Sequence, residues 1–167
     1  MVRPFPWLFP YTEDVVSRTS EVTGRTILHP VVQVTMAADE EQLVYALVDS
    51  GSEHTLSGMG HARLIGADPD PVREMRIGVG GAWRTARFAD IRLRLAPPDG
   101  APDDVVEWTA TVGFFTQWGP PWALLLGQVG FFDQFTVTMN RLSQALAIEP
   151  ATEFDARYGI HMEPNDR

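Results

Sequence analysis

The feature that most constrains the fold is a succession of short segments with strand character, separated by turns rich in Gly, Pro and acidic residues. The segments "RTILHPVVQVTMA" (25–37) and "LVYALVD" (43–49) are rich in Val, Ile, Leu, Thr and Tyr, and they flank the polar turn "ADEEQ". This pattern predicts a β-hairpin, because β-branched and aromatic residues favour strands and a short polar turn joins antiparallel neighbours.

A second hairpin is predicted in "VREMRIGVGGAWRTARFADIRLRLA" (72–96), where two alternating segments flank "GVGG". Gly80 and Gly81 can supply the positive φ angles that a tight hairpin turn requires. Further strands are predicted in the segments "VVEWTATVGFFTQW", "ALLLG", "FTVTMN" and "ALAIEP".

The remaining segments are predicted as loops or short helices. The Gly- and Pro-broken segment 58–71 is expected to be a loop with at most one helical turn, and 97–104 a loop. The segment "QVGFFDQF" (128–135) is expected to form one or two turns of helix. The sequence shows neither heptads nor a solenoid repeat, so we expect one all-β, closed fold.

Composition divides the chain into a Pro- and aromatic-rich N-terminal arm (1–24), a main domain (25–150) and an acidic, partly mobile tail (151–167). The formal charge is −9 and the sequence pI is about 4.8, which argues against a nucleic-acid-binding surface. The absence of Cys excludes disulfides, thiolate metal sites and a Cys nucleophile.

Neither a membrane span nor a signal peptide is predicted. The sequence has no run of 18 apolar residues, and Pro4, Pro6 and Pro10 interrupt the apolar N-terminal segment. We therefore expect a cytoplasmic protein with no membrane partner.

The most informative candidate site residue is Asp49, which ends an apolar strand and is followed by Ser50, Gly51 and Ser52. A buried carboxylate is costly unless it is paired or hydrogen-bonded. Asp-Ser-Gly is also a common way for a chain to leave a strand, since an Asp side chain can bond its own backbone. Asp49 therefore either caps a turn or is placed for chemistry.

In its context, "ALVDSGSEHTLS" (46–57) resembles the active-site segment of retropepsin-like aspartic proteases. The segment "ALLLG" (123–127) is similar to the second element of that family, which crosses behind the active-site loop. "MRIGVGGAWRTARF" (75–88) stands where the family has its flap hairpin, and "FFDQFTVTMN" resembles the helix and strand that follow. The resemblance implies a closed retropepsin-like β-barrel with a flap hairpin and one short helix.

The resemblance also implies the roles of the site residues. Asp49 would be the catalytic acid and base, Ser50 would hydrogen-bond across the loops, and Gly51 would let its backbone approach the carboxylate. Ser52 would hydrogen-bond the outer oxygen of Asp49. The chain holds only one Asp-Ser-Gly, so the family pattern implies a homodimer with Asp49 from each subunit at a two-fold axis.

The implied substrate is a peptide or protein that lies as an extended strand under two flaps. We expect Leu47, Val79, Trp83 and Leu125 to line the cleft, and Gly80 and Gly81 to act as a hinge. Glu53 and His54 are expected close to the dyad. In this family the termini often pair between subunits, and "ALAIEP" (145–150) and part of the arm are the candidate segments.

Other chemistries have weaker support. The histidines His29, His54, His61 and His161 match no helical zinc spacing, and we expect neither a metal nor a cofactor. The chain has no Gly-x-Ser-x-Gly elbow, and "GVGG" lacks the Lys-Ser/Thr of a phosphate-binding loop. The alternative to a peptidase is a non-catalytic dimerisation or peptide-binding module with the same fold.

Overall fold

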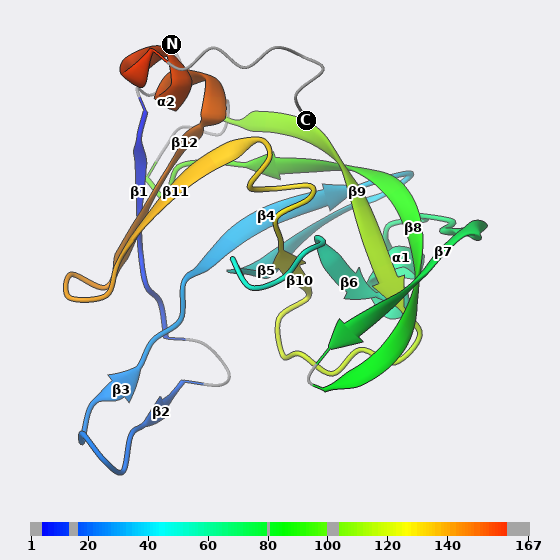
Figure 1. Cartoon of the computed structure of the whole chain (residues 1–167), viewed down its shortest axis with the longest axis horizontal. Helices are drawn as coiled ribbons and strands as arrows, with labels where there is room; N and C mark the ends of the chain where they lie inside the picture. Colours follow the sequence, from blue (N-terminus) through cyan, green and yellow to red (C-terminus); the bar gives the residue numbers. More distant parts are fainter. Residues whose placement is uncertain (1–4, 14–16, 80, 100–103, 160–167) are drawn as a thin grey trace.

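The computed structural model describes residues 5–13, 17–79, 81–99 and 104–159, and strands make up most of this part of the chain (Figure 1). The first six strands are β1 (Trp7–Pro10), β2 (Arg18–Thr19), β3 (Thr26–Ile27), β4 (Val31–Ala37), β5 (Glu41–Val48) and β6 (Leu56–Gly58). The other six are β7 (Asp70–Val79), β8 (Ala82–Leu95), β9 (Val106–Phe115), β10 (Leu124–Leu126), β11 (Phe135–Asn140) and β12 (Ala145–Pro150). The helices are α1 (Met59–Leu64) and α2 (Ala151–Tyr158). The expected all-β class is confirmed.

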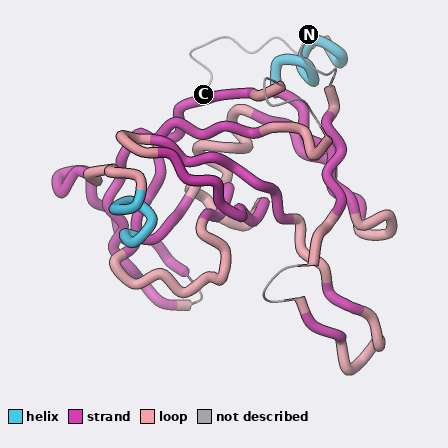
Figure 2. Tube along the Cα trace, turned by 180° about the vertical axis from the view of Figure 1, so that it is seen from behind, coloured by secondary structure: helices cyan, strands magenta, loops and turns pink. Residues whose placement is uncertain are grey.

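The main sheet has seven strands in the order β4-β5-β10-β6-β9-β8-β7, and β4 also pairs with β8. The 14-residue strand β8 makes this possible, because its first half pairs with β7, its last four residues pair with β4, and β9 runs along most of its length. The pairings therefore lead from β4 around the sheet and back to β4. Figure 2 shows the strands forming the body of the molecule, with both helices at its margins.

Both predicted hairpins are present. In the first, β4 pairs with β5 from Val31↔Leu47 to Ala37↔Glu41. In the second, β7 pairs with β8 up to Val79↔Ala82, and Gly81 has the predicted positive φ, at 81°. Gly80 lies outside the described residues. The main core includes alternate residues of β8 (Ile91, Leu93 and Leu95), which are buried.

The helices differ from the expectations. The predicted turn of helix in 58–71 is α1, six residues long. The segment 128–135, expected to be helical, instead forms turns, in which the amide of Phe135 bonds the carbonyl of Phe131. Here the chain is held from outside the segment: the Trp108 indole N–H donates to the carbonyl of Gly130, which has φ 96°. These contacts hold the segment in turns.

The C-terminal segment expected to be a mobile tail begins with α2, which ends at Gly159 in the left-handed conformation. The guanidinium of Arg157 forms an ion pair with Glu149, a buried residue of β12, and so attaches the helix to the sheet. Hydrogen bonding to Glu149 raises the pKa of Arg157. Residues 160–167 lie outside the described residues, as does His161.

A separate three-stranded sheet has the order β1-β12-β11. The predicted arm thus contributes β1 to the body of the protein, and its Trp7 and Phe9 are buried in the main core. We expected "ALAIEP" and the arm to pair between subunits, but in this structure they pair with each other in one chain. Since β11 takes the other edge of β12, no edge of β12 is left for a partner's strand.

None of the helices in the described part of the chain has the length and apolar character needed to cross a membrane.

Candidate functional site

Asp49 follows β5 at the point where three strands meet. Strand β10 lies between β5 and β6, parallel to β5 and antiparallel to β6. The amide of Asp49 extends this ladder by donating to the carbonyl of Leu126 at 3.0 Å. The half-buried strand β5 and the buried strand β10 therefore fix the backbone of Asp49, while its half-buried side chain stands at their end.

The turn after Asp49 orients the carboxylate. The amide of Gly51 donates to Oδ1 of Asp49 at 3.0 Å, and the amide of Ser52 donates to the Asp49 carbonyl at 3.1 Å. A Cβ on residue 51 would lie 3.3 Å from Oδ1, tighter than most real contacts. As expected, glycine lets the backbone approach the acid closely.

Ser52 is used differently from the expectation. The hydroxyl of Ser52 donates to the carbonyl of His54 at 2.7 Å instead of to the outer oxygen of Asp49. The turn brings the Gly51 amide to the carboxylate and aims the Ser52 side chain back into the loop. Ser50 is exposed, and its carbonyl accepts a hydrogen bond from the side-chain amide of Gln128 at 2.8 Å.

Thr55 and Gly127 hold the base of this loop together. Gly127 was expected only as part of the segment "ALLLG", and no role was predicted for Thr55. The buried hydroxyl of Thr55 donates to the carbonyl of Val129 at 2.9 Å and accepts from the amide of Gly127 at 3.2 Å. A Cβ at Gly127 would lie only 2.3 Å from the carbonyl oxygen of His54. Only glycine permits this crossing, as the resemblance to the second family element suggested.

The carboxylate borders a cavity of about 390 Å³, between the Asp49 loop and the β7–β8 hairpin. The lining residues are Asp49, Gly51, Ser52, Glu53, His54, Leu56, Met75, Arg76, Ile77, Gly78, Val79, Trp83 and Leu125. The expected cleft residues Val79, Trp83 and Leu125 are among them. Leu47 is not: it packs against the small apolar cluster beside the cavity, which includes Leu56 and Phe88.

Apart from Val79, the contribution of β7 was missed. Met75, Arg76, Ile77 and Gly78 all line the cavity, although residues 71–76 are exposed in the single chain. Alternation alone showed that this segment forms a strand, but not which of its residues would face Asp49. The cavity wraps around β7, so it is lined by consecutive residues from both faces of the strand.

Glu53 and His54 lie at the cavity, as expected. Nε2 of His54 lies 3.8 Å from Oε1 of Glu53, and only 13% of the His54 side chain is exposed against 82% for Glu53. The imidazole packs edge-on against Phe88, with ring centroids 5.5 Å apart. His54 is therefore held by its neighbours, while the Glu53 carboxylate remains in solvent.

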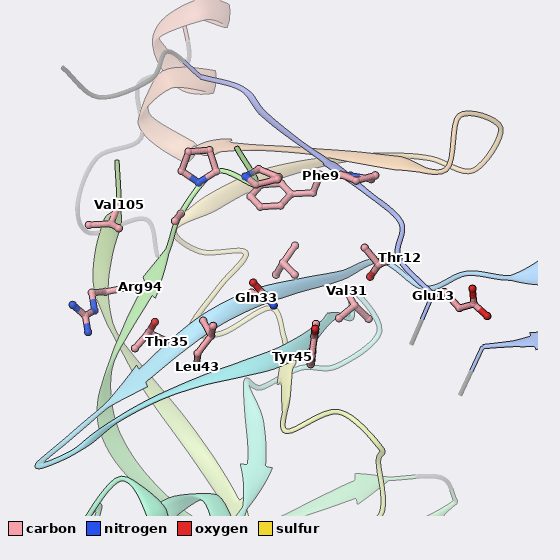
Figure 3. A pocket seen from close by; sticks show the side chains of 15 residues that line it. Phe9, Thr12, Glu13, Val31, Gln33, Thr35, Leu43, Tyr45, Arg94 and Val105 are labelled. Atoms are coloured by element: carbon pink, nitrogen blue, oxygen red, sulfur yellow. The ribbon is translucent and has the colours of Figure 1, made fainter. Parts of the chain in front are cut away.

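A larger groove, of about 740 Å³, lies elsewhere, between β1 and the outer face of the β4–β5 hairpin (Figure 3). Its lining is mainly apolar and includes the exposed side chains of Leu43 and Tyr45. Its cation, Arg94, is already paired with Glu41 and Glu107. The smaller cavity at Asp49 is the better candidate, since it combines a carboxylate oriented by a backbone amide with apolar walls.

Within residues 5–13, 17–79, 81–99 and 104–159, no three His, Asp or Glu side chains gather in a way that could hold a metal ion. No protein-family model matches the chain, and no curated protein sequence is significantly similar to it.

Proposed function

We propose that the protein is an aspartic endopeptidase with a closed, retropepsin-like fold that acts as a homodimer. One observation carries the proposal: the Asp49 carboxylate stands at the end of β5, accepts a hydrogen bond from the Gly51 amide, and borders a cavity under the β7–β8 hairpin. The ring of pairings through β4 and β8, and the crossing of β10 between β5 and β6, support the fold.

The homodimer follows from the chemistry. A metal-free hydrolysis of a peptide bond needs both a base to activate water and an acid to protonate the substrate. Two carboxylates held close together supply both, because like charges at that distance cannot both ionise and the pair shares one proton. One chain brings a single Asp49 loop, so a second copy, related by a two-fold axis, supplies the other acid.

During the reaction each carboxyl group of the dyad both accepts and donates a proton. The ionised Asp49 takes a proton from water as the water oxygen attacks the peptide carbonyl, and the protonated Asp49 gives its proton to the carbonyl oxygen. When the C–N bond breaks, the protonated carboxyl gives its proton to the leaving nitrogen, and a hydroxyl of the tetrahedral intermediate gives its proton to the other carboxylate. The acyl carbon keeps the water oxygen, and the dyad again holds one proton.

Strand β7 is the element best suited to hold the peptide. It ends the order of the main sheet and pairs only with β8 within the described residues, so one of its edges is free beside the cavity. An extended peptide can add to such an edge through main-chain hydrogen bonds. Its side chains would then meet the apolar residues Ile77, Val79 and Leu125.

A peptide-binding module without catalysis is the second candidate. The same free edge of β7 and the same apolar lining favour it, because both would bind a peptide whether or not two Asp49 side chains meet. The two candidates differ in one respect only: the peptidase needs the Asp49 carboxylate, whereas the module needs the cavity.

The deciding experiment compares wild type, Asp49→Asn and a matched control, Asp68→Asn, on a proteome-derived peptide library between acidic and neutral pH. Asp68 is an exposed carboxylate outside the cavity at Asp49. We expect cuts by wild type and Asp68→Asn that vanish in Asp49→Asn. If wild type makes no cuts as a folded dimer, the peptidase is refuted and the binding module is favoured.

A further inference from the structure

The β7 wall of the cavity carries a positive charge held in place by an aromatic ring. The guanidinium carbon of Arg76 lies 5.7 Å from the centroid of the Trp83 ring, within the range of a cation–π contact. Gly78 pairs with Trp83 across the hairpin, and one atom of the Trp83 ring lies 3.9 Å from the position that a Cβ at residue 78 would take. The tryptophan can therefore reach along β7 toward Arg76.

Arg76 differs from Arg73 and Arg87 of the same hairpin in its partners. Arg73 is bound to Asp90 and Arg87 is bound to Glu74, each at 3.1 Å. Arg76 has no carboxylate within ion-pair distance among the residues that the structure describes, and it lines the cavity instead. Its charge is oriented by Trp83 and remains open to a ligand.

The charges of the cavity are arranged unevenly. Glu53 and Asp49 belong to the loop wall, whereas Arg76 belongs to the β7 wall. A carboxylate on a bound peptide would be attracted toward Arg76 and repelled by Glu53. The whole chain carries a net charge of −9, so the attraction that Arg76 provides is local and opposite in sign to the net charge of the protein.

We propose that Arg76 is a specificity-determining residue that binds an acidic side chain of the substrate beside the scissile bond, an inference that rests on the proposed peptidase function. A planar guanidinium binds a carboxylate through two parallel hydrogen bonds, which a neutral amide of the same shape cannot match. The neighbouring Met75, Ile77 and Val79 favour apolar side chains next to that acidic residue.

The two-fold axis of the dimer makes this preference symmetric. Each subunit contributes one Arg76, so the complete cleft has two such residues at equal distances from the two Asp49 side chains. A preferred substrate therefore carries Asp or Glu on both sides of the cleaved bond, the same number of residues away in each direction.

The test measures cleavage specificity with charge variants of Arg76. Wild type, Arg76→Ala, Arg76→Glu and Arg92→Ala are each given the peptide library, and then a matched pair of peptides that differ by Glu against Gln at the preferred position. Arg92→Ala is the control, because Arg92 is an exposed arginine of β8 that does not line the cavity.

We expect Asp49-dependent cuts enriched in Asp and Glu on both sides, and a kcat/KM for the Glu peptide about tenfold or more above that for the Gln peptide. Arg76→Ala should remove this ratio, Arg76→Glu should shift the enrichment toward Lys and Arg, and Arg92→Ala should change neither. A merely structural role for Arg76 would not produce the reversal in the charge-swapped variant.

Two failures are distinguishable. Asp49-dependent cuts that lack acidic enrichment, or that keep it in Arg76→Ala, would overturn the role of Arg76 and leave the peptidase standing. Cuts that are absent from wild type as well as from Asp49→Asn would overturn the peptidase, and this inference with it.

Discussion

The two walls of the candidate site are built in contrasting ways. The wall that carries Asp49 is tied to the body of the protein: Thr55, Leu56 and Ser57 are buried, and backbone bonds join the loop to Leu126, Gln128 and Val129. The opposite wall is β7, an edge strand whose residues 71–76 are all exposed and which pairs with β8 alone within the described residues.

In the proposed peptidase, this difference separates the part of the site that performs the reaction from the part that recognises the peptide. A carboxylate that must meet its counterpart in a second subunit has to be held in one position, and fixed main-chain hydrogen bonds do this with little loss of conformational freedom during the reaction. A strand with few buried contacts opens at lower free energy than a core strand, so a hairpin of this kind can move aside for a peptide.

The largest expected effect comes from Gly127→Ala. The new Cβ would lie 2.3 Å from the carbonyl oxygen of His54, and this neighbour is backbone that cannot turn away. We expect a loss of about 3 kcal/mol or more in the free energy of unfolding, measured by urea denaturation. Gly119→Ala is the control: nothing lies within 4 Å of the added methyl, and the change should stay within about 0.5 kcal/mol. Equal stability of the two variants would contradict the claim that the close backbone contact at Gly127 holds the Asp49 wall rigid.

Thr55→Val should have the next largest effect. The substitution keeps the side-chain shape but removes the hydroxyl that bonds both the Val129 carbonyl and the Gly127 amide. Because the site is buried, the Gly127 amide would be left without a partner, whereas the Val129 carbonyl keeps its bond from the Thr55 amide, and we expect a loss of about 1 to 3 kcal/mol. Thr55→Ser restores the hydroxyl and should recover most of that loss, unless the methyl contact matters more than the hydrogen bonds.

Trp83→Ala tests the wall of the site that the β7–β8 hairpin forms. The Trp83 side chain is large but 70% exposed, so its removal should change the free energy of unfolding by no more than about 0.5 kcal/mol. Loss of its contact with Arg76 should nevertheless speed amide exchange along β7 relative to the Asp49 loop. If amide exchange in wild type is slower in β7 than in the Asp49 loop, β7 is the more rigid wall, which would contradict the assignment of the loop as the rigid wall.

The smallest effect is expected from Asp90→Asn, at the base of the hairpin. Hydrogen bonds from Arg73 and Thr111 hold the pKa of the Asp90 carboxyl below its usual value of 3.8. Folding therefore gains stability above pH 3.8, and this gain is lost as the pH falls through the lower pKa of the folded state. Since the side chain is about half exposed, we expect less than about 0.5 kcal/mol at pH 7. Urea unfolding at pH 7 and pH 3 should show a larger difference from wild type at pH 7 than at pH 3.

The sequence predicted the parts of the fold that local rules decide. Alternating residues and a Gly-Gly turn marked the β7–β8 hairpin, and the apolar run ending in Asp49 placed the acid at the end of a strand. Local rules failed at β12, where an apolar strand has the same appearance whether its neighbour comes from its own chain or a partner. They failed again at Ser52, since a hydroxyl bonds whichever acceptor the turn brings near, here the His54 carbonyl.

The most direct test of the central claim is whether two Asp49 positions meet. The chain has no cysteine, so in Asp49→Cys any disulfide-linked dimer must join the two copies of residue 49. Mild oxidation, followed by non-reducing electrophoresis, is run beside Ser143→Cys, an exposed position in the turn between β11 and β12. If the two Asp49 side chains meet in the dimer, Asp49→Cys should cross-link rapidly and Ser143→Cys should cross-link little. A native dimer whose Asp49→Cys form stays uncross-linked would contradict a shared dyad.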